Sequence, residues 1–269
     1  MRKLHGLVAL TCTIALAAAC SPSKEQAASP TPSPTATSSS PTAEATVDKP
    51  AVGECRLEQP TDIPPSTNET PPVPCSEPHT AYTAAVLQLP QETSYAGSAV
   101  GHLVGAQCPR AVQRATGLDA RTLTMSILTL SWFIPTDAEQ EAGARWVRCD
   151  VNAYTYDGNT PDAIYELPGL PIKDNALPES LRLCFRGGIQ PTRVSCSEEH
   201  TYRAETAVRL PTHGEPYPSA TAMRARVTTA CTRALGSHAD LAWTSPSRDD
   251  WAVDQAWVAC LTRDVGTPV

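Results

Sequence analysis

The sequence has few aromatic residues and no long membrane-spanning apolar run. It contains two Phe among 269 residues, and aromatic residues make up 5% of the chain. The uncharged, mostly apolar run Leu7–Ala19 has thirteen residues, whereas a membrane-spanning helix needs about 20. Gly97–Gly101 does not match the Gly-x-Ser-x-Gly elbow of serine hydrolases, and no Gly-rich phosphate loop is present. These absences argue against a spanning helix, an elbow-type hydrolase and a nucleotide-binding loop.

The N-terminus has the features of an export signal. Arg2 and Lys3 precede the apolar run, whose length suits a signal-peptide core. The run ends in Leu16-Ala-Ala-Ala-Cys20, which resembles the lipobox of bacterial lipoproteins. We therefore predict a signal peptide over residues 1–19 and acylation (palmitate) of Cys20, which would hold the protein on a membrane surface. The alternative is an ordinary secretory signal that leaves Cys20 as a free thiol.

Residues 20–50 are predicted to be a disordered linker after the lipidated cysteine. Pro, Ser, Thr and Ala make up 23 of the 30 positions from 21 to 50. Such a segment has almost nothing to bury, so the entropy lost on ordering would not be offset. An extended, proline-biased chain at about 3.1 Å per residue would reach roughly 90 Å from its anchor.

The mature chain is predicted to be acidic. Loss of residues 1–19 would remove two basic residues and no acid, which leaves 19 basic against 28 acidic residues, a charge of −9. An acidic surface with few aromatic residues argues against nucleic acid as a partner.

One segment of the chain occurs twice. Residues 75–90 and 196–211 align without a gap, and seven of the sixteen positions are identical, including the shared Cys-Ser-Glu-x-His-Thr. Further on, Trp-x2-Pro recurs at Trp132 and Trp243, with the same distance to a later Trp and Cys. Internal repetition of this kind predicts two tandem modules, over residues 51–157 and 181–265, joined by a linker over 158–180.

The repeat also accounts for the cysteines. Four fall in each copy, and an even number in an exported chain predicts disulfides. Four cysteines allow three pairings, and from the order along the chain we expect neighbours to pair. The expected bridges are Cys55–Cys75, Cys108–Cys149, Cys184–Cys196 and Cys231–Cys260.

The fold class predicted is α+β, with a small antiparallel sheet and one packed helix in each module. Apolar residues recur at helical spacing over 98–116, with Gly117 as a stop. Pro109 should kink this helix or start a second segment there. A second helix is expected over 219–235. Strands are expected over 52–57, 73–89, 122–132, with a bulge, and 145–155 in the first module. In the second module they are expected over 181–186, 194–210, 241–243 and 256–262.

These features together resemble the septum-formation-related domain of exported actinobacterial proteins. The resemblance rests on Gly53-Glu54-Cys55, the Val-x-Cys-Ser-Glu-Pro-His segment over 73–79, a helical Cys, Trp-x2-Pro and a final Cys. It covers both modules and is weaker in the second, where Arg182-Leu183 replaces Gly-Glu. It implies a role at the division septum or cell envelope, and it implies no catalytic residues and no cofactor.

The repeated His79 and His200 are the candidate binding residues, together with Glu77 and Glu198. Period-two alternation places each His on the apolar face of an expected strand, which favours a buried imidazole that bonds to nearby backbone or to the Glu. On an extended strand Cys75 and His79 would lie about 13 Å apart, too far to share a metal. The repeated Trp residues favour core packing over a glycan-stacking platform.

The sequence therefore predicts a non-catalytic interaction module, lipid-anchored on the extracytoplasmic face of the cell membrane, that acts in septum formation or cell-wall processes. Its partner would be an envelope protein or the wall. The alternative is an envelope glycan-binding protein or hydrolase that uses His79, His200 and the repeated Trp residues.

Overall fold

The computed structural model describes residues 49–264, except 97, 158–159, 188–190 and 237–239. The predicted signal peptide, the lipidation site Cys20 and nearly all of the predicted linker lie outside the described residues. All of the described residues belong to one compact unit. Within them, no helix combines the length and apolar character needed to cross a membrane.

The first half of the described chain builds one antiparallel sheet. Its strands run in the order β2-β1-β3-β5-β4, and β6 also pairs with β5. The strands are β1 (Cys55–Arg56), β2 (Pro72–Val73), β3 (Ala81–Gln88), β4 (Leu128–Phe133), β5 (Trp146–Asp157) and β6 (Thr160–Tyr165). The helices are η1 (Pro60–Asp62), α1 (Ser98–Thr116), α2 (Ala120–Thr124) and α3 (Asp137–Glu141).

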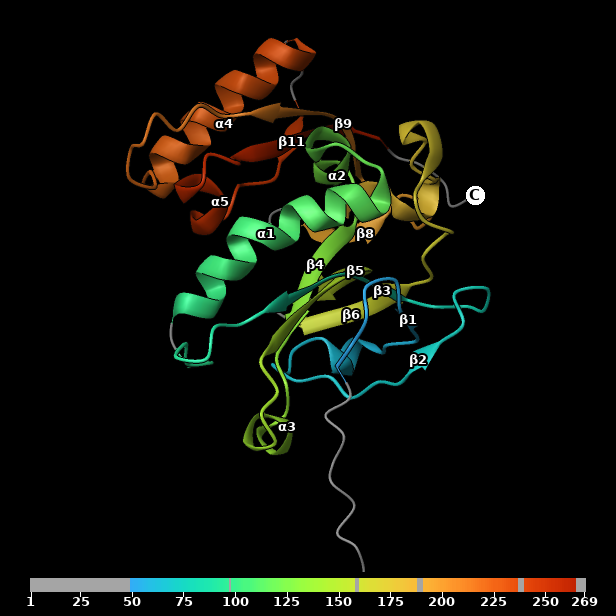
Figure 1. Cartoon of the computed structure of the whole chain (residues 1–269). Coiled ribbons are helices and arrows are strands. Elements are labelled where there is room, and N and C mark those ends of the chain that lie inside the picture. Colours follow the sequence, from blue (N-terminus) through green and yellow to red (C-terminus); the bar gives the residue numbers. More distant parts are fainter. Residues whose placement is uncertain (1–48, 97, 158–159, 188–190, 237–239, 265–269) are drawn as a thin grey trace, which may run out of the picture. The chain divides into compact units, whose positions relative to one another are not determined.

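The second half builds a five-stranded antiparallel sheet in the order β10-β11-β9-β7-β8. Its strands are β7 (Leu183–Arg186), β8 (Thr192–Ser195), β9 (Tyr202–Arg209), β10 (Leu241–Trp243) and β11 (Trp257–Arg263). Two short helices, η2 (Lys173–Asn175) and η3 (Glu179–Leu181), precede it, and α4 (Ala220–Leu235) and α5 (Arg248–Ala252) accompany it. As Figure 1 shows, α1 accompanies the first sheet and α4 the second.

The helix α1 has the bounds that the apolar spacing predicted. Its buried residues recur every three or four positions, so they form one stripe against the sheet. Pro109 lies inside the helix, and α1 continues through it as one helix, so of the two expectations, a kink or a new segment at Pro109, the new segment is excluded. Gly117 follows with a φ of +71°, and a Cβ there would lie 2.9 Å from the Cβ of Pro171. Glycine therefore provides both the helix stop and the close approach of the next segment.

Three expected strands were wrong in part. Residues 120–124 form α2, which begins at an Asp119 cap whose carboxylate accepts from the Thr122 N–H at 2.7 Å. The bulge expected within 122–132 is instead the junction between α2 and β4. The repeated motif lies in a turn before β3 and in another before β9 rather than on the strands themselves.

Residues 158–180, expected only to connect the modules, include β6. This strand pairs with the end of β5, and the Leu167 N–H beyond it donates to the His79 carbonyl at 2.9 Å. The segment therefore extends the first sheet on the side where β3 begins.

Backbone hydrogen bonds join the two halves. The Ile127 N–H donates to the Leu181 carbonyl at 2.8 Å, and the Leu183 N–H donates to the Met125 carbonyl at 2.9 Å. An isolated bridge pairs Ser126 with Arg182 between them. The residues just before β4 thus pair with the residues just before β7, so that backbone hydrogen bonds join the two sheets at this point.

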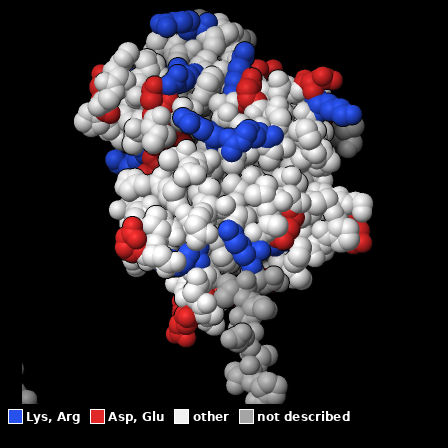
Figure 2. Space-filling view, viewed as in Figure 1, with Lys and Arg blue, Asp and Glu red and all other residues white. Residues whose placement is uncertain are grey.

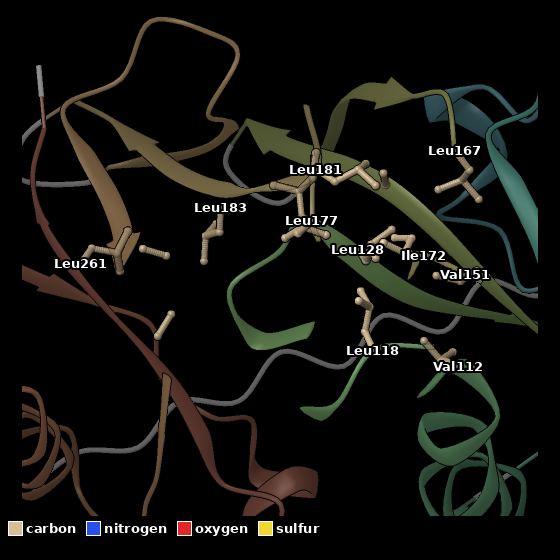
Figure 3. Packing of buried hydrophobic residues seen from close by; sticks show 14 residues of the cluster. Val112, Leu118, Leu128, Val151, Leu167, Ile172, Leu177, Leu181, Leu183 and Leu261 are labelled. Carbon is tan, nitrogen blue, oxygen red and sulfur yellow. The ribbon is translucent and has the colours of Figure 1, made fainter. Parts of the chain in front are cut away.

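One hydrophobic core also spans both halves. Val112 and Leu118 from α1 and its end lie in the same buried cluster as Leu183 and Leu261 from the second sheet, as Figure 3 shows. Two further clusters lie between α1 and the first sheet and between α4, α5 and the second sheet. The protein is thus α+β with two antiparallel sheets and four disulfides, while its division into tandem modules stays a prediction.

Candidate functional site

The two copies of the repeated motif make the same local contact. The Nδ1 of His79 lies 2.9 Å from the Glu77 carbonyl oxygen, and the Nδ1 of His200 lies 2.7 Å from the Glu198 carbonyl oxygen. A carbonyl can only accept, so Nδ1 carries the hydrogen in both copies. Both imidazoles are 5% exposed. The buried, backbone-bonded histidine predicted from the sequence is what the structure contains, and a ligand-binding role for the pair stays a prediction.

The glutamates of the motif have different surroundings. Glu77 is exposed, whereas the Glu198 carboxylate accepts a hydrogen bond from the Tyr165 hydroxyl and lies 3.5 Å from the Arg186 guanidinium. Burial and this hydrogen bond raise the pKa of Tyr165 to about 12, so the hydroxyl remains a donor. Glu198 therefore connects β6 to the turn that precedes β9.

The eight cysteines of the repeat are all bridged. The pairs are Cys55–Cys75, Cys108–Cys149, Cys184–Cys196 and Cys231–Cys260, which are the neighbour pairs predicted. Cys75 is therefore unavailable as a metal ligand or thiolate nucleophile, although its motif forms a turn and not the expected strand. In the described part of the chain, no group of three or more His, Cys, Asp or Glu residues could hold a metal ion.

A pocket of about 350 Å³ lies over β4 and β5, beneath the loop that follows η1. We call it the β4–β5 pocket. The loop is held there because the Ile134 N–H donates to the Ser66 carbonyl at 2.9 Å. The lining side chains are uncharged and rich in aromatic rings and proline: Ile63, Pro64, Pro65, Ser66, Leu130, Ser131, Trp132, Tyr154, Tyr156 and Pro161.

Four residues of the lining carry a hydroxyl group: Ser66, Ser131, Tyr154 and Tyr156. The Tyr154 and Tyr156 hydroxyls lie 3.0 Å apart, and their rings meet edge to face. Ser131 is 6% exposed, and its Oγ is closed off from solvent beside the Tyr154 hydroxyl, with which it forms a hydrogen bond. Burial, followed by the hydrogen bond with Tyr156, raises the pKa of Tyr154 above its ordinary value. The Tyr154 hydroxyl thus keeps its hydrogen at physiological pH, and the pocket offers neutral donors.

A buried polar cluster lies on the same face of β5. Arg148 donates from Nε to Asp150 Oδ2 at 2.7 Å and from Nη2 to Glu58 Oε1 at 3.3 Å. Asn152 donates from Nδ2 to Glu58 Oε2 at 2.7 Å, and Asn68 donates to Glu58 Oε1 at 3.0 Å. Glu58, Asp150 and Asn152 are fully buried.

Burial is the largest cause of the raised pKa values of the two carboxylic acids in this cluster. Loss of water, followed by the nearby Asp150 charge, raises the pKa of Glu58, while Arg148 and the hydrogen bond from Asn152 lower it, and the net pKa is about 7. Burial likewise raises the pKa of Asp150, against the effect of Arg148. Because both carboxylates are closed off from solvent, neither can touch a substrate as the site stands. The cluster lies on the face of β5 that also carries the pocket residues Tyr154 and Tyr156, and it supplies no accessible acid or base.

The repeated tryptophans differ in exposure. Trp146 is buried, as the core interpretation predicted, and Trp243 and Trp257 are half-buried. Trp132 is 38% exposed and lines the pocket, so for this residue the core interpretation was wrong. Edge strand β4 leaves one side of the ring uncovered.

Sequence reasoning missed most of this site. One signal was present: Arg148, Asp150, Asn152, Tyr154 and Tyr156 occupy every second position of β5, so that polar and hydroxyl groups share one face. No local sequence pattern, however, predicts that the loop over residues 59–70 covers that face of β5.

Comparison with known proteins places the chain in one family. No curated protein and no solved structure matched it. The model of the family described as Septum formation matches residues 102–260. This single span of 159 residues begins within α1, ends at Cys260 in β11 and so includes strands of both sheets. Because the match covers more than half of the 269 residues, the protein belongs to the septum formation family.

Proposed function

We propose that this protein is a non-catalytic interaction module of the cell envelope that acts in septum formation. It is exported, acylated at Cys20 and held on the extracytoplasmic face of the cell membrane, with the linker over 20–50 carrying the folded unit into the wall space. Two modules related by tandem duplication make up that unit. Family membership supports the cell-division and envelope setting, and the lipobox-like sequence supports the anchor.

The chemistry of the described residues supports binding over catalysis. The eight cysteines of the repeat are in disulfides, and His79 and His200 are buried and bonded to backbone. The carboxylates with strongly raised pKa values are closed off from solvent. The uncharged β4–β5 pocket is accessible, and a pocket lined by aromatic residues and a few polar groups is a default binding site. This pocket is the observation that carries the proposal.

The test is crosslinking in living cells with the lipid anchor intact. A photo-crosslinking amino acid placed at Ser66, on the pocket rim, should capture an envelope protein or wall material. The same probe at Thr221, an exposed residue of α4 outside the pocket, is the matched control and should give a weaker or different capture. A Cys20→Ala variant should lose membrane attachment and lower the yield. Recovery of the protein alone from both positions would contradict the proposal.

A second candidate function is binding of a wall glycan, and the exposed Trp132 ring favours it because aromatic rings stack on sugars. The hydrolase form of this alternative depends on His79 or His200. A His79→Ala variant that folds normally and loses turnover of a wall substrate would promote the hydrolase, whereas unchanged partner capture would count against it.

A further inference from the structure

The β4–β5 pocket lies at the open edge of the first sheet. Strand β4 is the last in the order of that sheet, so β5 covers only one of its two sides. Ser131 lies opposite Asp150 and shares a face of the sheet with Tyr154. Trp132 lies opposite Cys149 and belongs to the other face. Since residues of both faces line one pocket, that pocket follows the uncovered side of β4.

The hydrogen-bond pattern shows which backbone groups of β4 point out of the sheet. On the β3 side of β5, the Leu89 N–H donates to the Arg145 carbonyl at 2.8 Å. Residues of an antiparallel strand bond alternately to their two neighbours, so odd-numbered residues from 145 bond toward β3 and even-numbered ones toward β4. Asp150 is even-numbered and lies opposite Ser131. The even-numbered residues of β4 therefore direct their N–H and C=O groups away from β5.

A peptide carbonyl already occupies one end of this outer row. Ile134 follows β4 directly, and its N–H donates to the Ser66 carbonyl at 2.9 Å. Within the described chain, the next outward residues, Trp132 and Leu130, form no hydrogen bond on this side. Their N–H and C=O groups recur every second residue, about 7 Å apart. That spacing matches the backbone of another extended strand.

Within the described chain, β4 has none of the features that usually protect an open edge, which are charged residues, proline and bulges. Residues 126–134 contain no charge and no proline, and β4 pairs with β5 without a register shift. The pocket lining is also uncharged, whereas both kinds of charge are common on the face in Figure 2. A charged segment would lose water here without gaining an ion pair, so the edge fits an uncharged one.

We propose that the open edge of β4 binds an uncharged, extended peptide segment of another envelope protein, which adds to the first sheet as a further strand. The inference rests on the proposed function and names the form of the partner at the same site. Backbone groups of Leu130 and Trp132 provide affinity, and alternate side chains of the segment meet the two faces of the sheet and provide selectivity. A single segment fits beside the loop at Ser66, whereas the longer edge of a second copy would collide with that loop.

The experiment measures binding of a fluorescein-labelled peptide of four Val-Thr repeats to the full-length protein in detergent, with its disulfides intact, by fluorescence anisotropy. The control peptide has the same side chains and a methyl group on every backbone nitrogen, so it cannot donate to a strand. We expect saturable binding of the parent peptide. The methylated peptide should bind at least about tenfold more weakly, which corresponds to about 1.4 kcal/mol.

A pair of variants tests the outward N–H of Trp132. Trp132→Ala and Trp132→Pro both lack the ring, and only the proline variant lacks the N–H. Proline is tolerated on an edge strand where the N–H points outward, and melting temperatures show whether both variants fold. The proline variant should bind the parent peptide at least about fivefold more weakly than the alanine variant.

Amide hydrogen exchange tests the edge without any substitution. In the free protein the amides of Leu130 and Trp132 should exchange faster than that of Ser131, and the parent peptide should slow them at least about tenfold. Equal binding of the two peptides, binding of neither, or unchanged exchange at both amides would overturn the inference. A dimer in sedimentation that protects these amides would assign the edge to a second copy and would also overturn it.

The two proposals fail separately. If partner capture in cells persists in the folded Trp132→Pro variant, the strand site is wrong and the interaction role stands. If the parent peptide binds but no partner is captured from either crosslinking position, the interaction role is wrong and the site stands.

Discussion

Arg148 lies between two buried carboxylates, with its Nε 2.7 Å from Asp150 Oδ2 and its Nη2 3.3 Å from Glu58 Oε1. The three side chains come from β5 and from the loop after β1, and all are at most 3% exposed. One cation therefore compensates two acids in a place that water does not reach. This arrangement makes the first sheet sensitive both to pH and to loss of the arginine.

The stability of the protein should depend on pH through Glu58. Its pKa is raised to about 7 in the folded state from an ordinary value of 4.5, so the folded state holds the proton more tightly. The stabilisation is complete below about pH 4.5 and is lost as pH rises through 7, with a change of at most about 3 kcal/mol. Asp150, whose pKa is raised as well, adds a dependence of the same sign.

Urea unfolding of wild type and Glu58→Gln at intervals from pH 4.5 to 8 measures this effect. The free energy of unfolding of wild type should fall relative to the variant as pH rises, since glutamine does not titrate. Asp150 is present in both proteins, so its contribution cancels to first order. Parallel pH profiles would contradict the assignment to Glu58.

Arg148→Met should destabilise the protein strongly. Removal of one partner of a buried ion pair leaves uncompensated charge and costs about 3–5 kcal/mol. The control is Arg263→Ala, which removes an exposed pair with Asp240 at 3.5 Å and should cost less than about 1 kcal/mol. Chemical denaturation at pH 7 measures both, and similar losses in the two variants would count against a buried network.

The disulfides should differ in their contribution to stability. The bridge Cys108–Cys149 closes a separation of 41 residues and Cys184–Cys196 closes 12. The chain-entropy argument predicts that loss of the longer closure costs about 1 kcal/mol more. Paired Cys→Ala variants of each bridge, compared by denaturant unfolding, provide the measurement. A larger loss for the shorter closure would show that native packing dominates over chain entropy.

The two halves should unfold together. Leu181 is fully buried in the core cluster that includes Leu261 of the second sheet and Val151 of the first. Leu181→Ala should cost about 2–5 kcal/mol and should lower hydrogen-exchange protection in β5 and β11 alike. Leu57→Ala, at a position 46% exposed, should change stability by less than about 0.5 kcal/mol.

Independent loss of protection in one sheet would contradict a single cooperative unit. It would favour two modules that are stable apart, as the repeat in the sequence predicts.

The sequence by itself determined the features that depend on local order. The bounds of α1 followed from the spacing of apolar residues such as Val104 and Cys108, because a helix that buries one face needs that period. The stop at Gly117 followed from a backbone conformation that glycine adopts most readily. The even number of cysteines predicted disulfides but left three pairings open in each copy, and the structure contains the neighbour pairs we expected. Family membership followed from short motifs.

Only the tertiary structure decided where the site lies. Ser131 and Tyr154 are far apart in the chain and line one pocket because β4 pairs with β5. Glu58, from the loop after β1, reaches the same strand through Arg148 and Asn152. Whether a polar side chain on a strand is exposed or buried depends on what covers that face of the sheet. The covering loop has no periodic pattern from which its position could be predicted. The same reason explains Trp132: its repeat spacing predicted a core residue, and the open edge of β4 left it at the pocket.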